Sequence, residues 1–172
     1  MRQRQCSQIN MVATAKRRSI DQEIKKLDRN ICLWQLGSSF GSIEACILET
    51  VKLGHSDLEV GTVGLGCMGM STAYGRPNDP ESIATIHEAL DKGCNLLDSS
   101  DSYGEGHNEK LLAKALKQGY REKAVLISKF GNLGAKGVLG TPEYVMRACE
   151  KSLFQLNTDV IDLYFVHRVD PN

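Results

Sequence analysis

Beyond residue 50, apolar residues recur in short runs that alternate with amphipathic segments. The runs are spaced 31, 31 and 35 residues apart, taking as their starts Val63, Cys94, Val125 and Val160. Short, nearly uniform apolar runs are typical of strands that are buried on both faces of a parallel sheet. The spacing is that of a strand followed by a crossover helix. The pattern therefore predicts an α/β fold built from successive βα units.

Helix signals fill the intervals between these runs. The first helix is predicted after an N-cap at Asp79, with Pro80 in its first turn, and Gly93 ends it. The segment HNEKLLAKALKQG predicts a second helix that stops at Gly119, and Thr141 caps a third. The apolar residues at helical spacing, which we expect to face inward, are Ile83, Ile86, Leu90, Leu111, Leu112, Ala115, Leu116, Val145, Cys149, Leu153 and Leu156.

The residues before the first predicted βα unit indicate a β-hairpin, preceded by a separate N-terminal extension. LETVKLG and LEVGTVGLG flank HSD, a polar break that suits a turn, so residues 51–62 are expected to form the hairpin. Residues 1–49 differ, because the first twenty carry five basic residues and no acidic one. That start loosely resembles a mitochondrial transit peptide, although composition favours a disordered or poorly defined extension. Residues 21–34 could form one short helix, and the main domain is expected to cover residues 50–172.

Two parallel architectures fit the βα pattern: a doubly wound open sheet and an eight-unit (β/α) barrel. The open sheet draws support from a G-x-G-x-x-G match at Gly64, Gly66 and Gly69. The dinucleotide fingerprint needs a helix that begins within the glycine run, since the helix N-terminus binds the pyrophosphate. Here Gly75 and Pro77 would break any such helix. The sequence context therefore favours the barrel.

The composition of the chain argues against several classes of partner and site, as its charge, hydropathy and cysteine spacing show. The chain has 172 residues, 41% hydrophobic and 24% charged, with a formal net charge of zero, so neither nucleic acid nor an anionic membrane surface is the expected partner. No apolar run approaches the roughly 20 residues of a membrane-spanning helix. The six cysteines lie far apart without a C-x-x-C pair, which predicts reduced thiols in a cytoplasmic protein and no metal site.

Polar side chains at the ends of the predicted strands are the candidate chemistry. Asp98 closes CNLLD, Lys129 closes AVLISK and His167 closes DLYFVH, while Tyr103 lies in the loop that follows Asp98. In a parallel βα array these ends share one face, which holds the active site in barrels. Each residue has a structural alternative: a helix cap for Asp98, a solvated cation for Lys129 and a satisfied structural group for His167. A barrel aldolase, with Lys129 as a Schiff-base nucleophile, is a second enzymatic interpretation.

At these residues the sequence closely resembles the aldo-keto reductase superfamily. The matching segments are GLGCMGMS, NLLDSSDSYGEGHNEKLL, VLISKFGN and TPEYVMRACEKSLFQLNTDVIDLYFVHRVDPN. They cover about residues 50–172 and keep the family's order. The resemblance implies a (β/α)₈ TIM-barrel fold, with the N-terminal hairpin closing the bottom of the barrel, and NADPH-dependent reduction of small aldehydes and ketones to alcohols.

The resemblance also implies a role for each candidate residue. Tyr103 would be the general acid that protonates the carbonyl oxygen, and the ammonium of Lys129 would stabilise its phenolate. Asp98 would pair with Lys129, and His167 would donate a hydrogen bond to the carbonyl. The nicotinamide end of NADPH would approach Cys67 and Met68, and Asp98 as well.

The sequence matches only about the first four βα units of the roughly 250-residue barrel, so we expect a truncated barrel whose reductase activity is impaired. The family's other half normally holds most cofactor contacts. Open sheet edges would permit self-association. The alternatives are a non-catalytic regulatory or partner-binding module and a non-functional fragment. Ser99, Ser100 and Ser102 stand where many relatives have Thr, Ala and Met, and we expect no loss of chemistry from them.

Overall fold

The computed structural model describes residues 47–171 of the chain. The predictions made for the basic start and for a helix over residues 21–34 lie outside the described residues, and the proposed boundary at residue 49 stays a prediction.

The predicted N-terminal hairpin is present. Strand β1 (Thr50–Lys52) pairs antiparallel with β2 (Glu59–Gly61). In the turn, the Leu53 amide donates to the Leu58 carbonyl oxygen (2.9 Å), and the Ser56 hydroxyl donates to the Leu53 carbonyl oxygen (2.7 Å). The polar break HSD therefore forms the turn that the sequence indicated.

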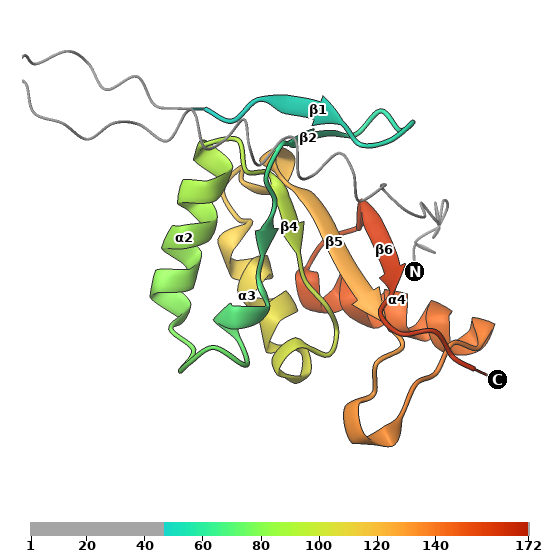
Figure 1. The fold of residues 1–172 in the computed structure, drawn as a ribbon. Helices are drawn as coiled ribbons and strands as arrows, with labels where there is room; N and C mark the ends of the chain where they lie inside the picture. Colours follow the sequence, from blue (N-terminus) through green and yellow to red (C-terminus); the bar gives the residue numbers. More distant parts are fainter. Residues whose placement is uncertain (1–46, 172) are drawn as a thin grey trace, which may run out of the picture. The chain divides into compact units, whose positions relative to one another are not determined.

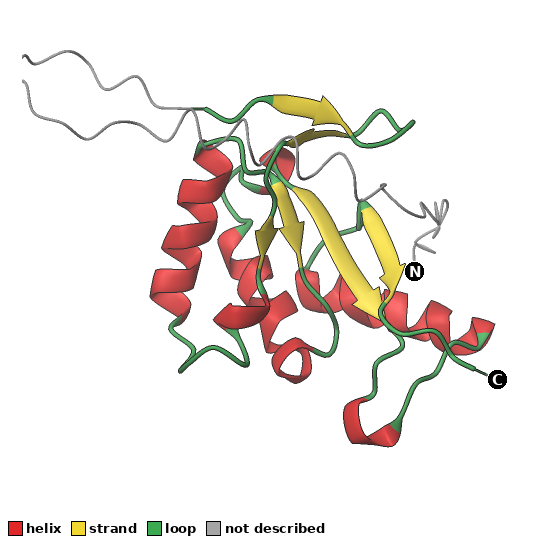
Figure 2. Ribbon diagram, viewed as in Figure 1, coloured by secondary structure: helices red, strands yellow, loops and turns green. Residues whose placement is uncertain are grey.

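The apolar runs form a parallel sheet, which Figures 1 and 2 show beside the helices. Its strands are β3 (Leu65–Gly66), β4 (Leu96–Asp98), β5 (Val125–Phe130) and β6 (Leu163–Val166), in that spatial order. Strand β5 begins where the sequence predicts, whereas the other three begin two or three residues later. Val63 and Val160 are exposed, because they belong to the loops that lead into β3 and β6.

The helices follow the strands in the predicted alternation. They are α2 (Asp79–Asp91), α3 (His107–Ala115) and α4 (Pro142–Leu156). Short 3₁₀ segments lie between the strands and helices: η1 (Met68–Met70), η2 (Tyr103–Gly106), η3 (Arg121–Lys123) and η4 (Gly134–Lys136).

The helix boundaries differ from the sequence prediction in detail. The N-cap of α2 is Asn78, whose side-chain oxygen accepts from the Glu81 amide (3.3 Å). Asp79 is the first helical residue, and its carboxylate instead contacts His107 and Lys114 from α3. Helix α3 ends at Ala115, before the predicted stop at Gly119. Thr141 precedes α4 as predicted, but its side chain makes no capping hydrogen bond.

Each face of the sheet packs against a different partner. Cys67, Leu97 and Leu126 pack against residues of α2, α3 and α4, such as Ile86, Leu112 and Leu156. Val125, Ile127 and Leu163 face the other way and pack against hairpin residues, including Val60. Of the predicted inward residues, eight are buried (Ile86, Leu90, Leu111, Leu112, Ala115, Leu116, Cys149, Leu156), and Ile83, Val145 and Leu153 are half-buried.

This arrangement matches the barrel prediction better than the doubly wound one. A doubly wound sheet carries helices on both faces, whereas here the helical core lies on one face and a hairpin packs on the other. Gly64 and Gly66 lie at or beside β3, and Gly69 lies in η1, well before α2 begins. The glycine run thus does not open a helix. Among the described residues, no helix is long and apolar enough to cross a bilayer.

The helix-side core provides a test of this packing. We expect Leu112→Ala to lower the free energy of unfolding by about 2–5 kcal/mol, because Leu112 is fully buried and its loss leaves a cavity. Phe154→Ala is the matched control: Phe154 is 82% exposed on α4, so its truncation should change stability by less than about 0.5 kcal/mol. Chemical denaturation measures both, and equal effects would contradict the core assignment.

Candidate active site

The sheet brings the four candidate side chains to one end of its strands. Asp98 is the last residue of β4, and Lys129 is the next-to-last residue of β5. His167 follows β6 directly, and its amide extends the ladder by donating to the Phe130 carbonyl oxygen (2.8 Å). Tyr103 opens the short segment η2. Because side chains alternate along a strand, Lys129 shares the face of Val125 and Ile127, opposite the helices.

The ammonium of Lys129 lies at the centre of this group. Its Nζ lies 2.6 Å from Asp98 Oδ1, and it donates to the hydroxyl oxygen of Tyr103 at 3.1 Å. A third hydrogen bond reaches the carbonyl oxygen of Ser99 at 2.9 Å. The Lys129 side chain is only 15% exposed, whereas that of Asp98 is 37% exposed. All three N–H bonds of the ammonium therefore have an acceptor, which lets a largely buried cation persist.

A tight turn fixes the position of Tyr103. The Tyr103 amide donates to the carbonyl oxygen of Ser100 (3.2 Å). The chain then adopts three successive left-handed conformations, at Gly104 (φ 57°), Glu105 (φ 54°) and Gly106 (φ 90°), before α3 begins. Glycine tolerates this conformation and other residues adopt it reluctantly. Tyr103 thus lies directly before this left-handed turn, with its hydroxyl in contact with Lys129.

His167 completes the group through its ring. The rings of His167 and Tyr103 meet edge to face, with centroids 5.7 Å apart and an interplanar angle of 88°. Its Nδ1 lies 3.0 Å from the Ser100 Oγ and 3.4 Å from the Ser102 Oγ. Burial lowers the pKa of His167, and the positive charges of Lys129 and Arg168 lower it further, outweighing the opposite effect of Asp98. The surroundings therefore favour the neutral imidazole.

Asn108 links the loops that surround the site. Its side chain is fully buried and donates to the Cys67 carbonyl oxygen (2.7 Å) and to the Ser71 Oγ (2.8 Å). It also accepts from the Ser99 Oγ at 2.7 Å. These bonds connect α3 to the segments that follow β3 and β4. The Asn108 amide therefore helps to hold the two loops in position relative to each other.

The next residue, Glu109, ties α3 to the sheet. It is also fully buried, and the Ser128 hydroxyl of β5 donates to its carboxyl at 2.6 Å. Burial raises the pKa of Glu109, and the Ser128 hydrogen bond opposes that shift. Ser128 lies next to Lys129 in the chain but faces the helices, so this contact anchors the strand from the opposite side of the sheet.

The predicted cofactor residues lie at the ends of β3 and β4. The Cys67 thiol is buried in the helix-side core, where burial raises the pKa of Cys67 to about 12, so its side chain is not available to a ligand. Its backbone amide donates to the Asp98 carbonyl oxygen (2.9 Å), and Met68 is half-buried. A side chain built at Gly66, the register partner of Asp98, would meet nothing within 4 Å. The assignment of Cys67, Met68 and Asp98 to the nicotinamide end of a cofactor stays a prediction.

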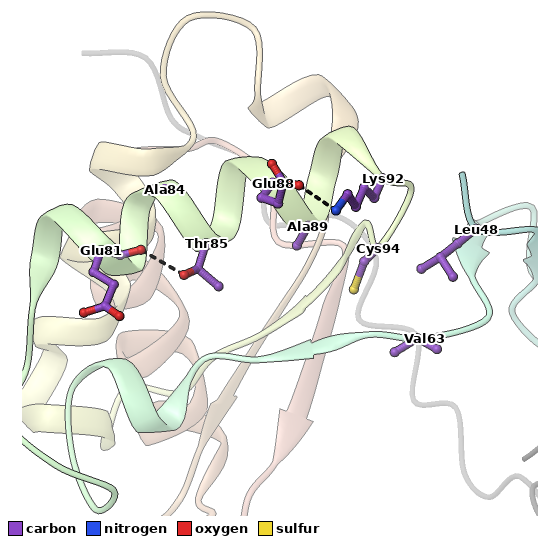
Figure 3. Close-up of a pocket in the computed structure, with 9 residues that line it drawn as sticks. All are labelled: Leu48, Val63, Glu81, Ala84, Thr85, Glu88, Ala89, Lys92 and Cys94. Carbon is purple, nitrogen blue, oxygen red and sulfur yellow. Dashed lines mark hydrogen bonds and ion pairs between the residues drawn. The ribbon is translucent and has the colours of Figure 1, made fainter. Parts of the chain in front are cut away.

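An open groove lies elsewhere, along α2 (Figure 3). It has a volume of about 670 Å³ and is lined by Leu48, Val63, Glu81, Ala84, Thr85, Glu88, Ala89, Lys92 and Cys94. Two of these lining residues, Glu88 and Lys92, form an ion pair of 2.6 Å, drawn as a dashed line in Figure 3. None of the four candidate residues lines it, so the groove is separate from the strand-end group.

Ser99, Ser100 and Ser102 were named from the sequence, but no contact with the four candidate residues was predicted for them. Ser100 and Ser102 contact His167, and the Ser99 carbonyl oxygen accepts from Lys129. The run of serines directly after Asp98 was the available signal, since polar residues at a strand end in a barrel line the site. Asn108 carried no such signal, because its contacts join segments that are far apart in the sequence.

The electrostatic surroundings of His167 give a prediction. Lys129→Met should raise the pKa of His167, because the change removes one of the positive charges that hold it down. Titration of the His167 ring by NMR measures the shift, and Lys52→Met in the hairpin is a control that should leave it unchanged. A lower or unaltered pKa in Lys129→Met would contradict the geometry. Since the native pKa of His167 lies below that of the unfolded chain, its contribution to stability is present above about pH 6.5 and is lost as the pH falls from there through the lower native pKa.

Comparison with known proteins places this geometry in a family. Residues 62–172 match the model of the aldo/keto reductase family. A curated relative from Glycine max, "Probable aldo-keto reductase 1", is 43% identical over 129 residues, which cover 72% of this chain and 37% of the relative.

Two solved structures extend the comparison. The aldo-keto reductase AKR11C1 from Bacillus halodurans (holo form) is 38% identical, with a TM-score of 0.58 over 68% of this chain and 39% of that protein. An aldo-keto reductase from Klebsiella pneumoniae in complex with NADPH is 30% identical, with a TM-score of 0.58 over 72% and 41% of the two chains. This chain thus spans about two fifths of the length of these relatives. Its βα units are those of a partial TIM barrel, and the chain belongs to the aldo/keto reductase family.

Proposed function

We propose that this chain takes part in the NADPH-dependent reduction of aldehydes and ketones to alcohols. The observation that carries the proposal is the contact of one ammonium, that of Lys129, with both the Asp98 carboxylate and the Tyr103 hydroxyl. The structure from Klebsiella pneumoniae in complex with NADPH supports the choice of cofactor, since it is a relative of the same family.

Tyr103 is the general acid in this proposal. Its hydroxyl would donate a proton to the substrate carbonyl oxygen, and the NADPH cofactor would supply the hydride when bound. The ammonium of Lys129, 3.1 Å from the phenol oxygen, would stabilise the phenolate that this proton transfer leaves. Tyr103 is half-buried, so a phenolate there would be less well hydrated than in water, and a cation at that place offsets the loss.

Asp98 and His167 have supporting roles. Asp98 holds the Lys129 ammonium by its 2.6 Å contact and so fixes the direction from which the cation meets the phenol. The ring of His167 stands edge-on to Tyr103 and would orient the substrate oxygen between them. Cys67, Met68 and Asp98 would contact the nicotinamide end of the cofactor; the Cys67 thiol is buried, and its backbone amide and carbonyl already bond to Asp98 and Asn108, so Cys67 would offer contact surface only.

Three further points belong to the proposal. We expect slow turnover, because the described residues assigned to the cofactor serve its nicotinamide end only. Cys67, Cys94 and Cys149, the cysteines among the described residues, are thiols and not disulfides, which supports a cytoplasmic location, where thiols stay reduced. Self-association would use β3 and β6, the outer strands of the described sheet.

The test is a comparison of two tyrosine variants of the 172-residue chain. NADPH consumption with 4-nitrobenzaldehyde should fall by about 10²–10⁴-fold in Tyr103→Phe, because the general acid is removed. Tyr120→Phe is the matched control: the hydroxyl of Tyr120 contacts Asp91, at the end of α2, and its loss should leave the rate unchanged. Equal rates of the wild-type and Tyr103→Phe chains, or no turnover by the wild type at saturating NADPH, would contradict the proposal.

A further inference from the structure

A polar cleft lies beside the strand-end group. It has a volume of about 250 Å³ and is formed by three segments of the chain. Asp101 and Ser102 line it from the loop after β4, Asn132 lines it from the loop after β5, and helix α4 forms its third side. Neither Tyr103 nor His167 lines it, so the cleft is a separate place from the one where a carbonyl group would react.

Ser102 connects the cleft to the strand-end group. It lines the cleft, and its Oγ also lies 3.4 Å from the Nδ1 of His167. The preceding residue, Asp101, is held at the end of β5, because its amide donates to the Lys129 carbonyl oxygen (3.2 Å). The cleft therefore begins one side chain away from the imidazole, and a small molecule that contacts His167 can extend into it.

The charged lining of the cleft is mainly positive. Arg147 and Lys151 line it from α4, one helical turn apart and so on the same face of the helix. Among the described residues, Asp101 is the one acid that lines it. The cleft thus keeps a net positive charge even when Asp101 is ionised.

Lys151 is the cation that offsets the charge of Asp101. Burial raises the pKa of Asp101, and its hydrogen bond with Ser100 and the charge of Lys151 oppose that shift. Arg147 has no such counterpart, because no hydrogen bond or ion pair joins its side chain to another residue of the described part of the chain. Arg147 is therefore the cation in excess, and it lies at the cleft.

The hydrogen-bonding groups of the cleft suit an acceptor of the same kind. A guanidinium presents its N–H donors in one plane, which matches the two oxygens of a carboxylate. The side chain of Asn132 accepts from the Gly134 amide (3.1 Å) through its Oδ1, so its Nδ2 hydrogens are what it offers to a ligand. A carboxylate satisfies both residues, whereas an uncharged group leaves the charge of Arg147 without a partner.

We propose that this cleft binds a carboxylate at the far end of the substrate, so that the preferred substrates are aldehydes and ketones that also carry a carboxylate group. Arg147 is then the specificity-determining residue, with Lys151 and Asn132 beside it. The substrate class rests on the proposed function, whereas the binding of a carboxylate in the cleft does not.

The test measures binding without turnover, by NMR of the 172-residue chain at neutral pH and without cofactor. The probe is 4-(hydroxymethyl)benzoate, the alcohol that corresponds to 4-carboxybenzaldehyde, and 4-nitrobenzyl alcohol is its uncharged control. We expect the benzoate to shift the guanidinium Nε signal of Arg147 and the amide signal of Ser102 saturably. The uncharged alcohol should leave the Arg147 signal in place. Shifts confined to the ring of His167 would place the carboxylate at the strand-end group and overturn the proposal.

Two charge-removing variants show whether the cleft is the place of binding. Arg147→Met should weaken binding of the benzoate by about 3–10-fold, because a charge-assisted pair is lost. Lys117→Met is the matched control: Lys117 is exposed, follows α3 and does not line the cleft, so the affinity should stay unchanged. Equal affinities in Arg147→Met and Lys117→Met, or equal displacement of the benzoate by inorganic phosphate, would contradict the proposal.

Steady-state kinetics gives the second measurement. Arg147→Met should raise the KM for 4-carboxybenzaldehyde and leave the KM for 4-nitrobenzaldehyde unchanged, with kcat unaltered, because Arg147 contacts the far end of the substrate only. Equal changes in KM for the two aldehydes would contradict the assignment. The NMR titration needs no turnover, so it decides the carboxylate site even if the Tyr103→Phe assay contradicts the proposed reductase activity.

Discussion

The Lys129 ammonium is the group on which the polar end of the sheet depends. A side chain with only 15% of its surface exposed cannot leave a cation without partners, since the loss of hydration would cost several kcal/mol. Asp98, Tyr103 and the Ser99 carbonyl oxygen supply one acceptor each. Asp98 is the last residue of β4, and Ser99 is the residue after it. The position of Lys129 therefore requires that β4 and β5 are parallel neighbours.

The two faces of the sheet divide stability from chemistry along the same strands. On the helix side, Leu97 and Leu126 are fully buried in the core, and Ser128 binds Glu109. On the opposite face, the hairpin covers Val125 and Ile127 at the start of β5, and Lys129 lies further along. Alternate residues of each strand thus pack in the helix-side core. On the opposite face, the polar side chains around Lys129 begin where the hairpin no longer covers the sheet. A helix-side cavity would therefore affect folding first and the site indirectly.

Periodicity predicted most of this fold from the sequence. The βα alternation, the hairpin and the inward residues of the helices follow from local patterns, and they agree with the structure because packing and propensity act in the same direction. Helix caps were less predictable, because both Asn78 and Asp79 are residue types that can cap α2. The Asp79 carboxylate instead contacts His107 and Lys114, which are distant in the sequence. The role of Asn108 could not be predicted either, because its hydrogen-bond partners belong to two segments that are distant in the sequence. The four strand-end residues could be selected from the sequence, but their distances could not.

The account is tested most directly by a double-mutant cycle on the free energy of unfolding with Asp98→Asn and Lys129→Met. If the two groups form the pair that organises the site, the double variant should be more stable than the sum of the single effects predicts, by about 0.5–1 kcal/mol. The coupling is expected in this lower range, because Asp98 is 37% exposed and water screens the pair. Strictly additive effects would show that the two side chains do not interact, and the arrangement built around Lys129 would then be wrong.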